Sequence, residues 1–414
     1  MRIELAPPTA ARLGVDYQSV VRGAFALVVL VGFVVFIEPS PYDLLFPVAL
    51  GLWGVGGFSV HRSIVPLLAV VLLYELGGFI SLIPFLDEKD SVVFVALSLY
   101  LGATSIVFAL YFAEDTQRRL DLCLKAYAAS TVLAAIAAIL GYFDVGGLAR
   151  IFTLYTRASG TFKDPNVFGS YLVLGGVYFV QRLVLLKTRH VIGTSLSLII
   201  VAAGIFLSFS RGSWGAFAVA TAMCIGMAYL TSADPAARRR IVGMGAAAVA
   251  AAVLAVVVLL AIGNVSDVFT QRFALEQDYD AGEMGRFGNQ LRSLPILLDS
   301  INGMGPLRFR LFFGIEPHNT YVNAFASYGW IGGLAFCLIV VLTTWVGFRV
   351  ALRPSPFRSS AQVVWPSLLV FFLQAFQIDI DHWRHVFFLL GAVWGLETAR
   401  LRWSAGTLAT ARLP

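Results

Sequence analysis

Long apolar blocks alternate with short polar connections along almost the whole chain. Each block runs for roughly 17 to 25 residues and lacks the apolar–polar alternation of a barrel strand. In a bilayer, only helices and closed barrels satisfy their own backbone hydrogen bonds. We therefore predict an all-α polytopic membrane protein, a single integral-membrane domain over residues 1–414. Its twelve expected spans lie near 19–37, 44–60, 63–84, 91–112, 119–141, 166–184, 190–208, 213–231, 241–262, 321–348, 362–377 and 385–400.

Charge predicts the orientation of these spans. Only 13% of residues are charged, yet the net charge is +6. Positive side chains collect on the cytoplasmic side of membrane proteins, and with a cytoplasmic N-terminus most of the 30 Lys and Arg fall on that side. Both termini are then cytoplasmic and the largest connection, residues 263–320, is outside. The positive charge is explained by topology, so we expect no nucleic-acid partner.

The arginines on the outer side are few and fall in four connections. Arg150, Arg157 and Lys163 precede the sixth span, Arg211 lies in "SFSRGSWG", the large loop carries five more, and Arg384 lies in "DIDHWRH". A guanidinium matches phosphate oxygens two at a time, and a charge on the disfavoured side suggests function. These arginines could instead reach lipid headgroups or pair with carboxylates. We interpret them as a candidate anion site.

A histidine stands where the large loop re-enters the membrane. His318 follows Pro317 in "PHNTYVN". Histidine exchanges a proton near neutral pH, and Asn319 could orient it or a substrate hydroxyl. Alternatively, Asn319 or Thr320 caps the next helix and the histidine has no role. A base beside an arginine cluster suits a transferase that expels a phosphate leaving group.

Three shorter signals lie on the same face. "RFGNQLRSLPILLDSI" and "GLARIFTLYTR" place apolar residues at helical spacing, which predicts two helices in the membrane interface. The apolar positions are Phe287, Leu291, Leu294 and Leu298 in the first stretch, and Leu148, Ile151 and Tyr155 in the second. Asp164-Pro165-Asn166 predicts a helix start with Asn166 as its cap.

Other ionisable residues have no assigned role at this stage. Asp379, Asp381, His382 and His385 in "DIDHWRH" could be metal ligands or part of an Asp–Arg–His network. Their spacing matches no tight metal template, so we predict no metal. Glu75, in the third span, is the only clear ionisable residue deep in a block.

Five motifs follow one another in a fixed order. They are "GTFKDPNVFGSYL", "SFSRGSWGAF", "GRFGNQ…GMGP", "PHNTYVNAFASYGWIGG" and "DHWRH". With the spans around them they resemble the O-antigen ligase and polymerase superfamily. The resemblance covers residues 150–395, while the first five spans match in hydropathy only.

The resemblance implies a GT-C-like glycosyltransferase in the bacterial inner membrane, with its active site on the periplasmic face. Such enzymes take a glycan from undecaprenyl diphosphate and move it to a hydroxyl of lipid A core (ligase) or of another lipid-linked glycan (polymerase). They use no metal or other cofactor and invert the anomeric centre. The resemblance assigns the diphosphate to Arg211 and Arg286 and the acceptor hydroxyl to His318. Further candidates for substrate binding are Arg157, Asn166, Asn319 and Arg384.

Alternatives stay open at this point. A polymerase would carry paired Arg-x10-Gly motifs; Arg292 and Gly303 fit this spacing, but neither Arg150 nor Arg157 does, so we favour a ligase. A transporter or flippase of an anionic glycolipid would place charge near the bilayer midplane, where the chain offers only Glu75. A non-catalytic scaffold would not explain the arginines and histidine.

Overall fold

The computed structural model describes residues 16–261, 263, 269 and 285–410, and part of the predicted 263–320 loop therefore lies outside the described residues. The structure is 79% helical, which confirms the all-α membrane class. Among the described residues, six helices are long and apolar enough to cross a membrane. Three further apolar helices are shorter. The count of twelve spans and their orientation stay predictions.

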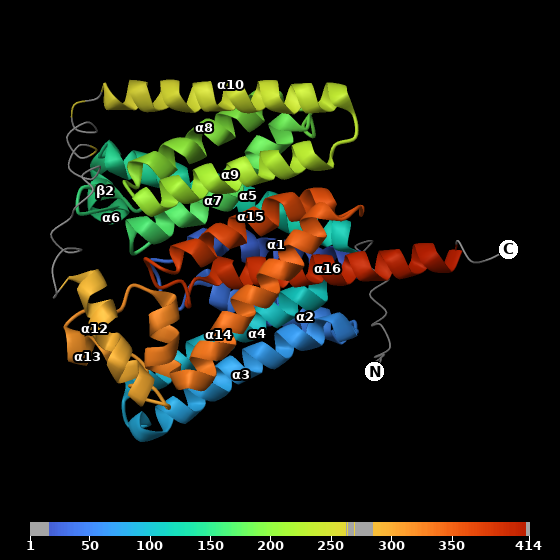
Figure 1. Ribbon diagram of the computed structural model, residues 1–414. Helices are drawn as coiled ribbons and strands as arrows, with labels where there is room; N and C mark the ends of the chain where they lie inside the picture. Colours follow the sequence, from blue (N-terminus) through green and yellow to red (C-terminus); the bar gives the residue numbers. More distant parts are fainter. Residues whose placement is uncertain (1–15, 262, 264–268, 270–284, 411–414) are drawn as a thin grey trace. The chain divides into compact units, whose positions relative to one another are not determined.

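The chain divides into two compact units, each made of three segments. The first comprises Met1–Val60, Glu114–Phe273 and Ala351–Ser367, and the second His61–Ala113, Ala274–Val350 and Leu368–Pro414. Helix α15 (Arg358–Gln374) begins in the first unit and ends in the second. Each unit is described below by itself (Figure 1).

In its described part, the first unit is a set of helices with one small hairpin. Its elements are α1 (Tyr17–Leu30), η1 (Val31–Phe33), α2 (Pro41–Val55), α5 (Thr116–Tyr142), η4 (Val145–Gly147), α6 (Ala149–Phe152), β1 (Thr153–Leu154), β2 (Arg157–Ala158), α7 (Pro165–Val184), α8 (Val191–Leu207), α9 (Arg211–Thr231) and α10 (Pro235–Leu260). Figure 1 shows α8, α9 and α10 running alongside one another.

Helix α7 is the most buried of the six candidate spans, and it packs against α5, α8 and α9. Small residues allow these close approaches. A Cβ atom at Gly175 would lie 2.1 Å from the Oγ1 of Thr131, and one at Gly176 would lie 2.5 Å from the ring of Phe217. Glycines of this kind let membrane helices pack backbone to backbone. The sixth predicted span is thus the centre of the first unit.

The second unit is also helical in its described part. Its elements are η2 (Arg62–Ile64), α3 (Val65–Leu82), η3 (Ile83–Phe85), α4 (Lys89–Phe112), α12 (Arg286–Asp299), α13 (Phe309–Phe313), α14 (Thr320–Leu352), the end of α15, and α16 (Arg384–Thr410). Helices α4 and α16 make the most extensive contact. Gly391 and Gly395 permit it, because a Cβ atom at Gly391 would lie 2.5 Å from the carbonyl oxygen of Ser105.

Helix α14 is broken near its start, where the sequence predicts one continuous span. Gly329 has φ +64° and ψ −166°, a conformation open only to glycine. The loop before α13 fills the break: Trp330 N donates to the carbonyl of Ile301 at 2.8 Å, and Met304 N donates to that of Ala326 at 2.7 Å. Backbone groups freed by the break are therefore satisfied from the loop.

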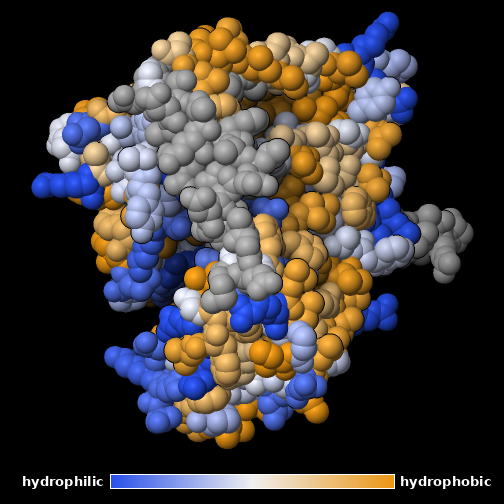
Figure 2. All heavy atoms as spheres, turned by 60° about the vertical axis from the view of Figure 1, so that its left-hand side comes forward, coloured by the Kyte–Doolittle hydropathy of each residue, from blue (hydrophilic) through white to orange (hydrophobic). Residues whose placement is uncertain are grey.

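Apolar side chains are exposed over much of the surface. Figure 2 shows apolar residues over a large part of the face that it presents. Among the exposed apolar residues of the chain are Val249 on α10, which is 64% exposed, and Trp345 on α14, which is 63% exposed. Exposed apolar area on this scale marks contact with lipid or a partner. It agrees with a membrane-embedded protein.

One of the two stretches predicted as interfacial helices forms a helix, and its place in the membrane interface stays a prediction. The first stretch forms α12, with Leu291 68% exposed and Asn289 buried, so the apolar face points away from the unit. The prediction for the second stretch was wrong. Helix α6 stops at Phe152, and the chain then turns back through Tyr155 and Thr156, which both have positive φ, into the β1–β2 hairpin. Two consecutive left-handed residues are typical of a tight hairpin turn.

Candidate functional site

Arg211 stands at the N-terminus of a helix. It is the first residue of α9, and the Ser210 side chain caps the helix by accepting from Ser213 N at 3.3 Å. The first N–H groups of a helix carry partial positive charge and attract anions. Arg211 is partly exposed, so the helix terminus and the guanidinium together give this turn a positive field.

Arg157 connects this turn to helix α7. It is 8% exposed. Its Nε donates to the carbonyl of Ser208 at 2.8 Å, and its Nη2 donates to Oδ1 of Asn166 at 2.8 Å. Arg157 and Asn166, both predicted to bind substrate, are therefore brought together beside the Arg211 turn. The bond from Arg157 to Ser208 holds the turn, and the bond from Arg157 to Asn166 ties it to the start of α7.

A second helix N-terminus lies next to the first. Asp164, one residue before α7, accepts from Asn166 N at 2.6 Å and from Val167 N at 3.3 Å. The prediction that Asn166 is the cap was wrong: Pro165 occupies the first helical position, as proline prefers, and so the preceding residue is the cap. Ser213 Oγ donates to the carbonyl of Asn166 at 3.2 Å, which ties the starts of α7 and α9 together.

Gly169 allows this close approach of α7 to the turn. A Cβ atom there would lie 2.6 Å from the Oγ of Ser208 and 2.7 Å from the Oγ of Ser213. No larger residue fits without moving the turn. The glycine in "NVFGSYL" thus has a packing role that its motif alone does not reveal.

In the second unit, His318 is exposed and its backbone is held in an unusual conformation. Its φ is +46°, in the left-handed region that few non-glycine residues adopt. Asp379 accepts from the backbone N–H groups of His318 and Asn319, each at 3.1 Å. Strained backbone of this kind persists where the surroundings fix it. Asp379 therefore positions the histidine, a role that the sequence did not reveal.

The environment of Asp379 is acidic. Burial, followed by the charges of Asp381 and Glu316, raises the pKa of Asp379 to about 8, although the N–H groups of Asn319 and His318 act to lower it. Burial also raises the pKa of Glu316, with Arg310 opposing. Buried like charges disfavour simultaneous ionisation.

Arg286 is anchored to the same short segment as His318. It is the first residue of α12, and its Nη1 donates to the carbonyl of Gln377 at 3.1 Å. The guanidinium also lies over the ring of Phe287, 4.8 Å from its centroid. The residues at 377–379 thus hold both Arg286 and the backbone of His318. Two predicted catalytic residues, far apart in the sequence, are brought to one segment.

Asn319 has two structural roles, as a helix cap and as a partner of Gln290. Its Oδ1 accepts from Tyr321 N at 3.0 Å and from Val322 N at 3.2 Å, so it caps α14. The cap that one alternative predicted at Asn319 is therefore confirmed, and the role of His318 stays a prediction. Its Nδ2 donates to Oε1 of Gln290 at 3.3 Å, and Gln290 Nε2 donates to the carbonyl of Pro317 at 2.8 Å. Gln290 is a further positioning residue, found only from the structure.

The remaining acidic and histidine residues form a buried network. Asp381 is 8% exposed, accepts from Asn323 Nδ2 at 2.9 Å and lies 3.5 Å from Nδ1 of His382. Burial would lower the pKa of His382, but Asp381 outweighs it and raises that pKa. Among the residues that the structure describes, no three His, Cys, Asp or Glu side chains are grouped to hold a metal ion.

Several other arginines that the topology predicts on the outer side have structural partners. Arg308 pairs with Glu88 and lies over the ring of Phe85, 4.1 Å from its centroid. Arg310 pairs with Glu316 at 3.4 Å. These pairs match the alternative that outer arginines bind carboxylates. Arg384, the first residue of α16, is half-buried, and its role in binding stays a prediction.

The predicted site residues fall into two groups. Arg157, Asn166 and Arg211 belong to the first unit, and Arg286, His318, Asn319 and Arg384 to the second. Convergence of the two groups stays a prediction. In comparisons with known proteins, no family model matches the chain and no curated protein matches it in sequence.

Proposed function

We propose that the chain is a membrane glycosyltransferase that moves a glycan from undecaprenyl diphosphate to a hydroxyl acceptor. The favoured acceptor is lipid A core, as in an O-antigen ligase, and the active face is periplasmic. The observation that carries the proposal is the anchoring of Arg286 and the His318 backbone to residues 377–379. It brings a candidate base and a candidate diphosphate ligand to one place in the second unit.

The chemistry is a single displacement. A ring nitrogen of His318 takes the proton of the acceptor hydroxyl while that oxygen bonds to the anomeric carbon of the glycan. The bond from this carbon to the diphosphate oxygen breaks, and undecaprenyl diphosphate leaves with the electron pair. Attack opposite the leaving group inverts the anomeric centre. General base catalysis of this kind contributes roughly 10²–10⁴-fold.

Arg211 and Arg286 stabilise the charge that develops on the diphosphate. Arg211 acts together with the N-terminus of α9, whose N–H groups favour anions. A preorganised donor at such a position is worth about 3–4 kcal/mol in the transition state. Arg157 and Asn166 keep the turn in place through their own hydrogen bonds.

The polymerase alternative rests on the Arg292–Gly303 spacing. Gly303 has φ +77°, and a Cβ atom there would lie 2.6 Å from the carbonyl oxygen of Ala326. This packing requires glycine at position 303 whatever reaction the protein catalyses. The spacing therefore gives the polymerase little support.

The proposal is tested by transfer in vitro. Purified protein receives undecaprenyl-diphosphate-linked glycan in EDTA, with lipid A core or with no added acceptor. We expect glycan on lipid A core, with Arg211→Ala reducing the rate by about 100- to 1,000-fold, and Arg310→Ala, which removes an arginine paired with Glu316, having little effect. Longer glycan on undecaprenyl diphosphate would indicate a polymerase. No transfer, together with loss of lipid export in Glu75→Gln, would indicate a transporter.

A further inference from the structure

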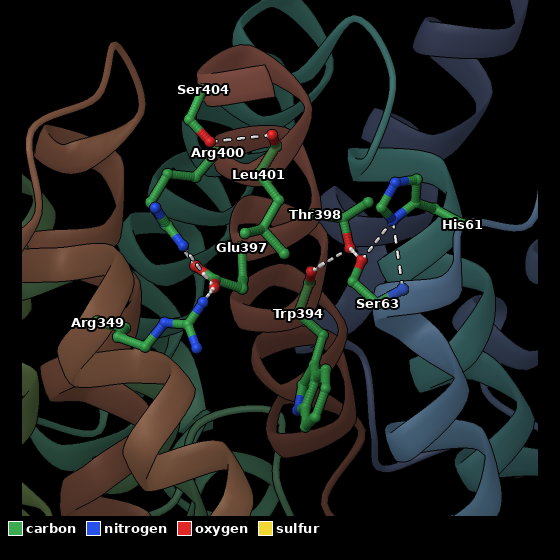
Figure 3. Close-up of polar contacts among 9 residues, drawn as sticks. All are labelled: His61, Ser63, Arg349, Trp394, Glu397, Thr398, Arg400, Leu401 and Ser404. Carbon is green, nitrogen blue, oxygen red and sulfur yellow. Dashed lines mark hydrogen bonds and ion pairs between the residues drawn. The ribbon is translucent and has the colours of Figure 1, made fainter. Parts of the chain in front are cut away.

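A second cluster of charged side chains lies in the second unit, at the other end of the helices that begin near His318 (Figure 3). Glu397 on α16 accepts from Arg400 Nε at 2.7 Å and from Arg400 Nη2 at 2.8 Å. Arg349, in the last turn of α14, places its Nη2 2.6 Å from the same carboxylate. Helix α14 begins at Thr320, so its last turn is far from the candidate active site.

The cluster carries more positive than negative charge. Two guanidiniums share one carboxylate, and Arg402 nearby on α16 donates to the carbonyl of Ala113 at 3.0 Å. The pKa of His61 is lowered by burial and then by the charges of Arg402 and Arg62. Positive charge therefore gathers at this end of the unit, beyond what Glu397 balances.

The surrounding contacts hold the cluster in place. His61 Nδ1 lies 2.8 Å from Ser63 Oγ, which lies 2.7 Å from Thr398 Oγ1, and Thr398 donates to the carbonyl of Trp394 at 2.9 Å. Figure 3 shows this series of hydrogen bonds on the other side of α16 from Arg349 and Arg400. It joins η2, just before α3, to α16 next to Glu397, and so keeps the helix that carries Glu397 and Arg400 fixed.

Neutralising Glu397 does not require Arg349. Arg400 already binds both carboxylate oxygens, a geometry that balances a buried carboxylate well. Arg400 is 7% exposed at its side chain, whereas that of Arg349 is 30% exposed. The Nε of Arg349 is buried and has no hydrogen-bond partner within the described part of the chain, so an anion must approach the exposed remainder of the guanidinium. Because Arg400 already balances Glu397, that exposed part of Arg349 is able to bind a second anion.

The helix face that leads to Arg349 is apolar and exposed. Trp345, one turn earlier on α14, is 63% exposed, and Val341, a further turn back, is 62% exposed. Tryptophan prefers the headgroup level of a bilayer, and a basic side chain just beyond it reaches the phosphates. The order Val341, Trp345, Arg349 thus matches the order of acyl chain, interface and phosphate in a lipid.

We propose that Arg349, held by Glu397 beside Arg400, binds the phosphodiester of an anionic phospholipid whose acyl chains lie along Val341 and Trp345. Basic pockets between membrane helices bind lipid headgroups in this way. The site is independent of the proposed glycosyl transfer and lies at the opposite end of α14 from His318.

The test measures lipid retention by the full-length chain. Purified, delipidated protein is mixed with dioleoylphosphatidylglycerol or dioleoylphosphatidylcholine, and bound lipid is counted by native mass spectrometry. We expect retention of the anionic lipid, about fivefold weaker in Arg349→Gln. Arg349→Lys, which keeps the charge, should fall between the two. Arg189→Gln removes an exposed arginine from the connection between α7 and α8 and should behave as the unchanged protein.

Two further arms make the result decisive. Trp345→Ala leaves the charged cluster intact and should also weaken retention, which covers the case in which Arg349→Gln does not fold. Equal retention in the unchanged protein and the folded variants overturns the proposal. So does an equal rise in melting temperature with inorganic phosphate and with the lipid, because a free anion would then suffice.

Discussion

The two groups of candidate site residues are held in opposite ways, one by a side chain that donates hydrogen bonds and the other by a side chain that accepts them. In the first unit a buried cation, Arg157, donates to the Ser208 carbonyl and so fixes the turn that carries Arg211. In the second unit the acidic side chain of Asp379 accepts from backbone N–H groups and so fixes His318.

The difference matches what each group is proposed to do. A leaving diphosphate needs positive charge, and a turn tied down by arginine at two helix N-termini adds to that charge. A base must be held in place to take up a proton, and Asp379, whose raised pKa leaves it largely protonated near neutral pH, does this by accepting from the backbone N–H groups of His318 and Asn319. Each positioning residue therefore has the hydrogen-bonding chemistry that suits its neighbour's task. The predictions below test this comparison, from the largest expected effect to the smallest.

The largest effect is expected for the histidine itself. His318→Asn keeps a residue type that tolerates positive φ but removes the base. We expect a transfer rate roughly 10²–10⁴-fold lower, measured with glycan on undecaprenyl diphosphate and lipid A core. Because the side chain is exposed, the melting temperature should not change. An active His318→Asn enzyme would show that another group takes the proton.

A smaller loss is expected for its positioning residue. Asp379→Asn leaves one acceptor for two N–H donors, so the His318 backbone should shift and transfer should fall by up to about 100-fold. The maximal rate should drop while the Michaelis constant for the donor stays nearly constant, because Asp379 holds the base and not the diphosphate. A rise in that constant alone would assign Asp379 to donor binding.

The corresponding change in the first unit should act on stability as well as activity. Arg157→Gln leaves the buried Ser208 carbonyl without its donor, so we expect the free energy of unfolding to fall by about 1–3 kcal/mol. Chemical denaturation in detergent measures it. Lys163→Gln is the matched control, since it removes an exposed cation paired with Glu38, and its effect should stay within about 1 kcal/mol.

The effect that is smallest over any single pH unit is a pH dependence of stability. The pKa of Asp379 is raised to about 8, so the folded protein keeps a proton that the unfolded chain releases near its ordinary value of 3.8. The free energy of unfolding should therefore decrease as pH rises between these values, by at most about 1.4 kcal/mol per pH unit. Melting temperatures across this range measure it. Asp379→Asn should show a flatter profile, and an identical profile would exclude Asp379 as the cause.

Local pattern was sufficient for most helices. Apolar length predicted α4, α5, α7 and α9 close to their observed bounds, because in lipid an apolar block has little alternative to a helix. Helical spacing also predicted α12, and the Asn319 cap was among the stated alternatives. The start of α7 was predicted correctly, but its cap is Asp164.

Features that depend on contacts between residues far apart in the sequence could not be predicted from local pattern. Nothing in "GLARIFTLYTR" marks Tyr155 and Thr156 for positive φ, since neither is glycine or asparagine. Helix α14 breaks at Gly329 because the loop before α13 packs directly against this residue. Other glycines in the same helix do not break it. The difference comes from a neighbour that the local sequence does not contain.

The sequence by itself determined that this is a helical membrane protein and which side chains could carry chemistry, because both follow from residue type and local spacing. The tertiary structure alone decided how those side chains are held. Asp379, in the connection between α15 and α16, accepts from the backbone N–H group of His318, and Arg157 donates to the Ser208 carbonyl in the turn beside Arg211. Such roles depend on which buried donors and acceptors meet, and that is set only when the helices pack.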